Sequence, residues 1–503
     1  MKKMQCDIVV IGGGGSGLIA GARAATMGKS VVVLEKDKNL GGGMNMASTM
    51  RTFGSKWQKE RNLPDTTALY MRNRMDETFW RINKKLAASI IQGTGKFFDW
   101  FCEICPKEDL DGFYVGKYVF DEDDGPLGPQ SGGHHIAGKS KGGGRVMVEA
   151  CSAKLKELEQ PIITEVLTDE IVVKDGKVVG VKAHKGNESI IIDCKACILA
   201  CGSWIRNPEF VREHYPKLAD ALPYMGDSPH QNWNYTGDGL KLARNAGAKM
   251  DTENLTIRMM GPMTMCRSRV MGDMSNSAYS IYVNKNGERF VCEGSQLRMG
   301  VFDSGSVQVE QPDGAAFVIF DEKGLRMSIE NPDVHPQPQL AMPFGASSFP
   351  KTMEEAKADM EPALAANDGV VFRADTIEEL AQMLEIPVDA LKNTIETYNG
   401  YCEDGMDWDC YKPAEWLEPI NEGPFYAVKA SMGTDGVFGG VEINENMQVK
   451  AAEGGLVEGL YCVGDLASGR FLNMAGIKKQ IINDMSFAYS SGYTAGTHAA
   501  ENL

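Results

Sequence analysis

Residues 7–35 read DIVVIGGGGSGLIAGARAATMGKSVVVLE and predict the architecture from which the rest of the chain can be interpreted. The four apolar residues 8–11 are typical of a parallel strand that is buried on both faces, and residues 31–34 predict a second strand. Gly12, Gly14 and Gly17 follow the first strand in the spacing G-x-G-x-x-G, before a helix predicted over residues 18–28. This order predicts a βαβ unit that binds a dinucleotide, with the diphosphate at the helix N-terminus.

The acid that ends the second strand narrows the choice of dinucleotide. Glu35 is placed to hydrogen-bond a ribose diol, and its negative charge would repel the 2′-phosphate of NADP. FAD and NAD therefore remain. Gly15 and Ser16 in the glycine turn, and Lys36 directly after Glu35, are also predicted to contact this cofactor.

Composition and charge exclude several classes of protein. The 503 residues are 43% apolar and carry a formal net charge of −16, which excludes a disordered chain and disfavours nucleic acid and anionic membranes as partners. No apolar run approaches the roughly 20 residues of a membrane span. Met1–Lys3 imitate the start of a secretory signal, but Asp7 and the glycines interrupt the apolar run. With 12 Cys and 28 Met, a reducing cytoplasm is expected, and an anaerobe fits.

Several further segments carry a resemblance to a known family. They are Gly459–Asp465 (GLYCVGD), Ile191–Gly202 (IIDCKACILACG), Thr236–Gly239 (TGDG), Asn284–Phe290 (NKNGERF), Asp375–Leu380 (DTIEEL) and Pro424–Ala427 (PFYA). With the glycine turn, they resemble the flavoprotein family of soluble fumarate reductase, succinate dehydrogenase, urocanate reductase and 3-ketosteroid Δ1-dehydrogenase. This resemblance selects FAD as the cofactor.

The resemblance also implies a fold class and a domain organisation. It implies an α/β fold in which a discontinuous Rossmann-like FAD-binding domain, residues 1–254 and 411–503, holds an inserted α+β capping domain at residues 255–410. A capping box at Thr376–Glu379 predicts the start of an amphipathic helix in the insert, and Asp389–Tyr398 predicts a second helix.

The resemblance further implies how FAD is held and reduced. Some family members attach FAD covalently through a His after the second strand, but residues 40–50 contain no His, so FAD is expected to be non-covalent. No second G-x-G-x-x-G is evident, which implies a separate electron donor, either a protein carrier or a reduced nicotinamide or flavin. The remaining implied FAD contacts are Gly42, Gly43, Asn45, Met46, Gly143, Val166, Ala200, Cys201, Gly202, Asp238, Gly464, Asp465, Gly476 and Ile477.

The implied reaction is hydride transfer between FAD and a carbon–carbon bond beside an activating group. Two fixtures that grip the carboxylates of fumarate in the family are missing here. Residues 435–440 (DGVFGG) stand where the family has His-His-Thr-Met-Gly-Gly, and Met474 stands where it has an Arg. Because a buried dianion needs cationic partners, a flatter and less charged acceptor is favoured over fumarate. The candidate substrate contacts are Met259, Met260, Asp435, Gly436, Phe438 and Met474.

Three function classes stay open. The first is a reductase of an enone, a steroid-like ketone or an aryl-acrylate. The second is a ketone or steroid desaturating dehydrogenase that runs in the opposite direction, with fumarate reductase as a more remote alternative. The third is an FAD-binding module without catalysis. The sequence cannot choose the direction, because redox potential and donor supply set it.

The proton donor is also left open. Arg298 follows the Arg-Phe-Val-Cys-Glu segment one residue out of the family's register, so it is either the acid catalyst or an ordinary structural Arg. Tyr279 and Tyr118 are alternative donors. Lys478 and Lys479 are placed at the start of a helix over residues 481–492, where they either face the flavin or are solvated.

No metal site is expected. Cys194 and Cys197 are predicted to lie in one strand at odd spacing, so their side chains would point to opposite faces. His134 and His135 have no clear third ligand, so a metal is disfavoured there too.

Overall fold

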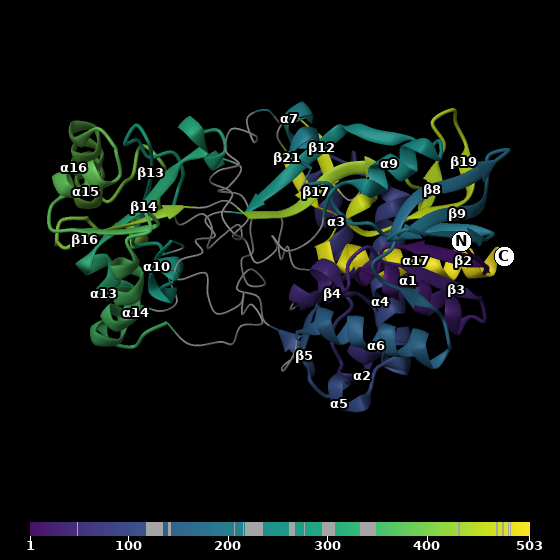
Figure 1. Cartoon of the computed structure of the whole chain (residues 1–503). Helices are drawn as coiled ribbons and strands as arrows, with labels where there is room; N and C mark the ends of the chain where they lie inside the picture. Colours follow the sequence, from purple (N-terminus) through teal and green to yellow (C-terminus); the bar gives the residue numbers. More distant parts are fainter. Residues whose placement is uncertain are drawn as a thin grey trace. The chain divides into compact units, whose positions relative to one another are not determined.

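The computed structural model describes residues 1–47, 49–116, 134–138, 142–205, 207–214, 216, 235–260, 267–275, 277–293, 307–331, 349–430, 433–468, 471–474, 477–480, 482 and 484–503. The chain falls into two compact units. The first comprises Met1–Phe210, Trp233–Ile257 and Gly436–Leu503, and the second comprises Val211–Asn232 and Arg258–Asp435. The fold is mixed α/β, as predicted (Figure 1).

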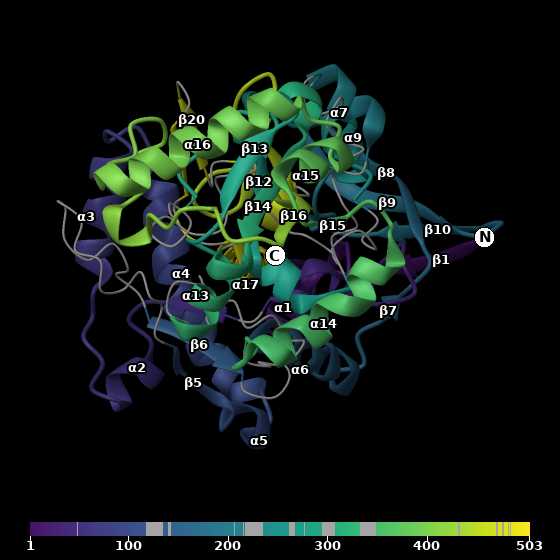
Figure 2. The same ribbon diagram turned by 90° about the vertical axis from the view of Figure 1, so that its left-hand side faces the viewer.

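The first unit is built on a ten-stranded sheet. Four central strands run parallel in the order β19-β11-β2-β3, and Figure 2 shows β1, β8, β9 and β10 gathered at one edge. The strands are β1 (Lys2–Gln5), β2 (Ile8–Ile11), β3 (Val31–Leu34), β7 (Ile162–Ile163), β8 (Leu167–Lys174), β9 (Lys177–Lys185), β10 (Glu188–Asp193), β11 (Ala196–Leu199), β18 (Gln448–Lys450) and β19 (Leu456–Cys462).

Helices cover this sheet because its central strands are apolar on both faces. Every residue of β2, β3 and β11 is buried. Helix α1 packs closely on α17, since a Cβ at Gly492 or Gly496 would lie 2.4 Å from a backbone oxygen of α1. The helices of this unit are α1 (Gly15–Thr26), α2 (Lys56–Glu60), α3 (Thr67–Glu77), α4 (Lys84–Ile104), α5 (Lys107–Leu110), α6 (Gly143–Glu157), α9 (Asp238–Asn245) and α17 (Asp484–Glu501).

Smaller sheets complete the strand pairing. One has the order β4-β6-β5, and two are the two-stranded pairs β12-β17 and β20-β21. Two of the four crossings of the chain between the units, at 257–258 and 435–436, lie within β12 and β17. The bounds are β4 (Thr49–Thr52), β5 (Phe113–Gly116), β6 (His134–Gly138), β12 (Met250–Met260), β17 (Gly433–Val441), β20 (Phe471–Met474) and β21 (Ile477–Gln480), and α7 spans Pro208–His214.

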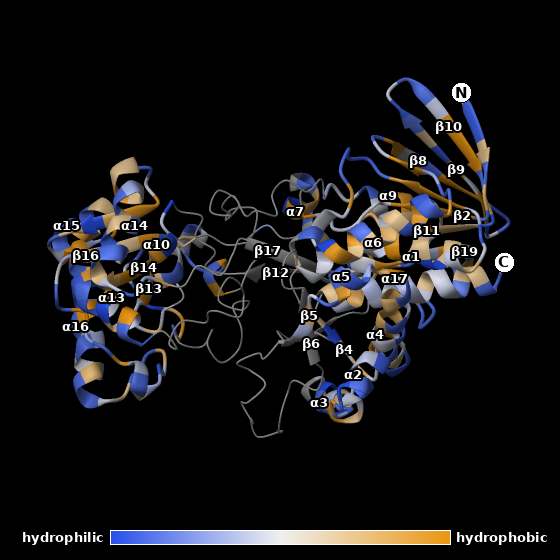
Figure 3. Cartoon of the chain, turned by 90° about the horizontal axis from the view of Figure 1, so that it is seen from below, coloured by the Kyte–Doolittle hydropathy of each residue, from blue (hydrophilic) through white to orange (hydrophobic). Residues whose placement is uncertain are grey.

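The second unit has its own four-stranded antiparallel sheet between two helical layers. Alternate residues of β14 face opposite cores: Val318 and Phe320 pack towards α10, α13 and α14, while Phe317 and Ile319 pack towards α15 and α16. Figure 1 shows these two helical layers, and Figure 3 shows apolar residues concentrated on the strands between them. The sheet order is β13 (Ile281–Asn284), β14 (Ala316–Asp321), β16 (Phe425–Ala430) and β15 (Val371–Ala374). The helices are α10 (Arg269–Met274), α13 (Glu322–Glu330), α14 (Met353–Ala366), α15 (Ile377–Met383) and α16 (Val388–Asp404).

The domain boundaries differ from those expected. The sequence placed the return to the first unit at residue 411, whereas the second unit extends to Asp435. The reason is β16, which pairs with both β14 and β15 and so belongs to the sheet of the insert. The helix after the Thr376 cap begins as predicted, with the Thr376 hydroxyl accepting the N–H of Glu379.

Two local predictions were wrong. Cys194 and Cys197 do not share a strand, because β10 ends at Asp193 and β11 begins at Ala196. At this junction the N–H groups of Lys195 and Ala196 both donate to the Asp7 carbonyl. Lys478 and Lys479 lie in strand β21, and the following helix begins at Asp484. Among the described residues, no helix is both long enough and apolar enough to span a bilayer.

Candidate functional site

The carboxyl ends of four parallel strands lie along one edge of the large sheet. Strands β2, β3, β11 and β19 end at Ile11, Leu34, Leu199 and Cys462. The segment that follows each of them carries predicted cofactor contacts. Because ligands of open α/β sheets bind in the crevice at the carboxyl edge, this arrangement brings most of the predicted FAD contacts to one place.

In the glycine turn after β2, two positions have no room for a side chain and a third has open space beside it. Gly12 has a φ of +111°, and a Cβ there would lie 2.3 Å from the Ala200 carbonyl oxygen. A Cβ at Gly17 would lie 2.0 Å from the Gly12 oxygen. At Gly14, by contrast, an added Cβ would meet no atom of the described residues within 4 Å beyond those of the adjoining backbone. This open cradle at the start of α1 fits a diphosphate that approaches the backbone closely.

The Glu35 carboxylate is fixed beside this turn. Its Oε2 accepts the N–H of Gly13 at 2.6 Å, and its Oε1 accepts the N–H of Asp37 at 2.8 Å. Burial raises the pKa of Glu35, and the two backbone N–H groups oppose this rise by stabilising the carboxylate. The side chain is thus held in one orientation at the end of β3, where it can accept hydrogen bonds from a ribose diol.

Lys36 reaches from the end of β3 to the start of α9. Its ammonium lies 2.8 Å from Asp238 Oδ2 and 2.8 Å from Thr236 Oγ1. Lys36 and Asp238 were both predicted FAD contacts, and the structure pairs them. No role was predicted for Thr236, although it lies in the Thr-Gly-Asp-Gly segment.

The segments after β11 and β19 form another part of the same edge. Gly464 has a φ of +65°, and a Cβ there would lie 2.6 Å from Ser16 Oγ. Its N–H donates to the hydroxyl of Ser491 on α17, a partner that no sequence motif indicated. Asp465 is the next residue of the short helix Gly464–Leu466. Because its neighbour Gly464 lies against Ser16, Asp465 is also near the glycine turn.

Cys201 lies two residues after the end of β11 and is a free thiol. Its Sγ donates to the Ile11 carbonyl at 3.4 Å. Burial raises the pKa of this thiol to about 12, which disfavours the nucleophilic thiolate at neutral pH. The carbonyl of the adjoining Ala200 packs closely against Gly12 of the glycine turn. Gly202, with a φ of +70°, packs against the ring of Tyr235.

The short helix Gly42–Met46 closes another side of the turn. Gly41 before it donates to the Gly13 carbonyl at 2.8 Å, and the Asn45 amide donates to the Leu40 carbonyl at 2.8 Å. A Cβ at Gly144 would lie 2.0 Å from the Met44 oxygen, so the start of α6 packs tightly here. These contacts bring the predicted positions Gly42, Gly43, Asn45 and Gly143 to the first unit's glycine turn. Val166 joins them by donating its N–H to the Glu35 carbonyl.

Other predicted residues lie outside the described residues, in segments described by their backbone alone, or in the second unit. Gly476, Arg298 and Tyr118 lie outside the described residues. Only the backbone is described for Met46, Met259, Met260, Asp435, Gly436, Phe438, Met474 and Ile477, which lie in the short helix Gly42–Met46 or in β12, β17, β20 and β21. Tyr279 is 7% exposed in the second unit, and burial raises its pKa.

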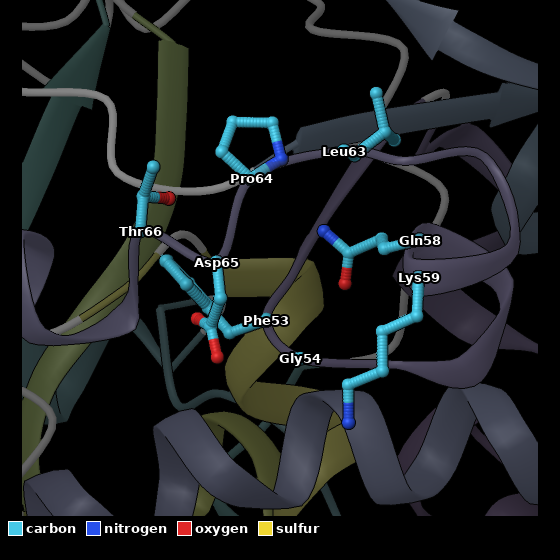
Figure 4. Close-up of a pocket in the computed structure, with 8 residues that line it drawn as sticks. All are labelled: Phe53, Gly54, Gln58, Lys59, Leu63, Pro64, Asp65 and Thr66. Carbon is cyan, nitrogen blue, oxygen red and sulfur yellow. The ribbon is translucent and has the colours of Figure 1, made fainter.

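A small hollow in the first unit does not coincide with this edge (Figure 4). Its lining is Phe53, Gly54, Gln58, Lys59, Leu63, Pro64, Asp65 and Thr66. No predicted cofactor or substrate residue is among them. Within the described ranges, no group of three or more His, Cys, Asp and Glu side chains could hold a metal ion.

Comparison with known proteins identifies the family. The family described as FAD binding domain matches residues 7–475. The chain belongs to this FAD-binding family. It is therefore an FAD-dependent oxidoreductase, and the residues of the glycine turn fit the diphosphate of that cofactor.

Its relatives include enzymes with different substrates. The chain is 26% identical to vinyl phenol reductase of Lactiplantibacillus plantarum, over 99% of this chain and 97% of that protein. It is 26% identical to urocanate reductase of Eggerthella lenta, over 98% of this chain and 74% of that protein. The structure of 3-ketosteroid Δ1-dehydrogenase from Sterolibacterium denitrificans shares the fold, with a TM-score of 0.74, 18% identity, and coverage of 99% of this chain and 100% of that one.

Proposed function

We propose that the chain is a flavin-dependent reductase of an activated C=C bond, and that its acceptor is flat and weakly charged rather than a dicarboxylate. The acceptor classes are an aryl-acrylate or a related vinyl arene, an enone and a steroid-like ketone. The similarity to vinyl phenol reductase over nearly the full length of both proteins is the observation that carries this proposal.

The fixtures that are missing from the sequence support the same acceptor class. Asp435 and Phe438 occupy a segment where the fumarate reductases carry two His, and Met474 replaces an Arg. Two carboxylates in a closed site without cationic partners would be unpaired buried charges, which cost several kcal/mol. An aromatic ring or an enone does not incur this cost, and Met, the residue type at positions 259, 260 and 474, adapts readily to apolar ligands.

The chain's own groups supply position, electrostatics and a proton. FAD, when bound, supplies the hydride transfer to or from a substrate carbon. We propose that FAD is held without a covalent bond and is reduced by a separate donor, in the cytoplasm. Arg298 is proposed as the acid that protonates the substrate carbon next to the activating group, with Tyr279 or Tyr118 as the alternative. Burial raises the pKa of Tyr279, which makes this side chain a weaker acid than an ordinary Tyr.

The experiment that tests this proposal is anaerobic reoxidation of the reduced enzyme. The FAD-loaded protein is reduced with dithionite and mixed in separate runs with a vinylphenol, cinnamate, an enone and fumarate, while flavin absorbance is followed. We expect at least one of the first three to reoxidise the flavin about a hundredfold faster than fumarate, because a dianion finds no paired site.

The same assay separates the alternatives. Rapid reoxidation by fumarate alone would contradict the proposed acceptor class. Bleaching of the oxidised enzyme by a saturated ketone or steroid, without reoxidation by any alkene, would show a desaturating dehydrogenase instead.

A further inference from the structure

We propose that Lys36, Thr236 and Asp238 form an ion-pair clasp at the Glu35 end of the FAD site, and that this clasp slows the release of bound FAD. The inference rests on FAD binding, which follows from the family, and does not depend on the proposed substrate. In this proposal Lys36 and Asp238 slow FAD release as an ion pair, and neither residue has this effect without the other.

The three side chains close a hydrogen-bonded triangle. The Lys36 ammonium donates to Asp238 Oδ2 and to Thr236 Oγ1, both at 2.8 Å. The Thr236 hydroxyl donates in turn to the same Asp238 oxygen at 2.8 Å. Burial alone would raise the pKa of Asp238, but the hydrogen bonds from Lys36 and Thr236 lower it. The carboxylate is therefore charged at neutral pH, and the pair is a true ion pair.

The clasp joins two segments that are anchored separately. Lys36 directly follows Glu35 at the carboxyl end of β3, and Asp238 is the first residue of α9. The start of α9 packs against the segment that follows β11, which contains Cys201 and Trp204. A Cβ at Gly239 would lie 2.8 Å from Cys201 Cβ, and a Cβ at Gly237 would lie 3.0 Å from Trp204 Cβ. Because both ends are fixed, the Lys36 side chain connects the carboxyl end of β3 to the start of α9.

The exposure of the pair favours a role towards the ligand over a role in folding. The side chain of Lys36 is 20% exposed and that of Asp238 is 47% exposed. Partly exposed ion pairs contribute little to folding, because water and salt screen them. Such a pair can open to water at low cost and close again, which is the property that admission and retention of a cofactor require.

The first unit offers a matched control pair at the opposite end of its strands. Lys195 and Asp7 also lie 2.8 Å apart, with side chains 60% and 24% exposed. They join the amino ends of β11 and β2, whereas Lys36 and Asp238 lie at the carboxyl edge. Removing the charge of Lys195 changes the net charge as K36M does, but at a distance from the proposed clasp.

The test measures FAD release from the holoenzymes of wild type, K36M, K36R, D238N, K36M/D238N and K195M. Each FAD-loaded protein is diluted rapidly, and the rate at which free-flavin fluorescence appears gives the dissociation rate. We expect K36M and D238N each to raise this rate on the order of tenfold, and the double variant to be no faster than either one. K36R keeps the charge and should release FAD nearly as slowly as wild type, and K195M should match wild type.

Two further readouts distinguish a clasp from a structural pair. Added NaCl should speed release from wild type but have little further effect on K36M, because salt screens only a pair that exists. The urea midpoint of each apoprotein should stay near that of wild type. Unchanged release rates in both single variants would overturn the proposal. Additive effects of the two substitutions would also overturn it, because independent contacts with FAD would then explain them.

Discussion

We expect G17A to destabilise the folded first unit and to weaken FAD binding with it, whereas G14A should weaken FAD binding alone. At Gly17 an added Cβ would lie 2.0 Å from the Gly12 oxygen, so the turn cannot form around it. We expect G17A to lower the free energy of unfolding by about 3 kcal/mol or more. The measurement is urea unfolding of the apoproteins, followed by intrinsic fluorescence.

Gly14 provides the contrast within the same turn. Its φ of −69° suits any residue, and the space around its Cβ is open. G14A should therefore leave the urea midpoint of the apoprotein unchanged. FAD affinity should fall roughly ten- to a hundredfold, because the methyl group would occupy the space through which the diphosphate approaches the N–H groups. Equal FAD affinity for G14A and wild type, measured by titration, would place the diphosphate elsewhere.

R289M destabilises the second unit by about 3–5 kcal/mol, because it removes the centre of a buried charge network. The Arg289 guanidinium donates to Glu293 at 2.7 Å and to Asp407 at 2.8 Å, and all three side chains are at most 2% exposed. Lys412 lies buried beside this network and donates to Tyr398 and to the Ser280 carbonyl, and burial lowers its pKa. The variant therefore leaves two buried carboxylates without the guanidinium that pairs with both of them.

The pH dependence of stability provides a second readout of the same network. Burial alone would raise the pKa of Asp407, but Arg289 lowers it. In wild type this carboxylate therefore stabilises the fold above its ordinary pKa of 3.8, and the contribution is lost as the pH falls below that value. In R289M the pKa of Asp407 should rise, because Arg289 no longer opposes the effect of burial, so lowering the pH through that raised pKa should restore part of the lost stability. R326M is the control, because Arg326 pairs with Glu422 at the surface of the same unit, and its urea midpoint should stay close to that of wild type.

The parts of the molecule that were predictable from sequence are those with a local physical signature. The sequence of residues 7–35 predicted β2, the glycine turn, α1 and β3, because apolar strands, glycine spacing and a terminal acid are all local patterns. The helix after Thr376 was predictable for the same reason, since its cap is formed by a neighbouring residue.

The features that were missed depend on contacts between distant segments. The end of the insert was misplaced because β16 belongs with β14, and only strand pairing shows this. Cys194 was assigned to a strand because the apolar run continues through it, although the Asp7 carbonyl redirects the chain there. Thr236 and Ser491 carry no motif that predicts their partners, because these partners are about 200 and 27 residues away. The substrate contacts remain predictions from the sequence.

A competition experiment tests the proposed function most directly. The anaerobically reduced, FAD-loaded enzyme is mixed with equal concentrations of fumarate and of the best neutral or aryl-substituted alkene, and the products of one turnover are quantified by mass spectrometry. We expect the saturated product of the second alkene to dominate, with one molecule formed per flavin reoxidised. Succinate as the main product, or flavin reoxidation without any saturated product, would contradict the proposal.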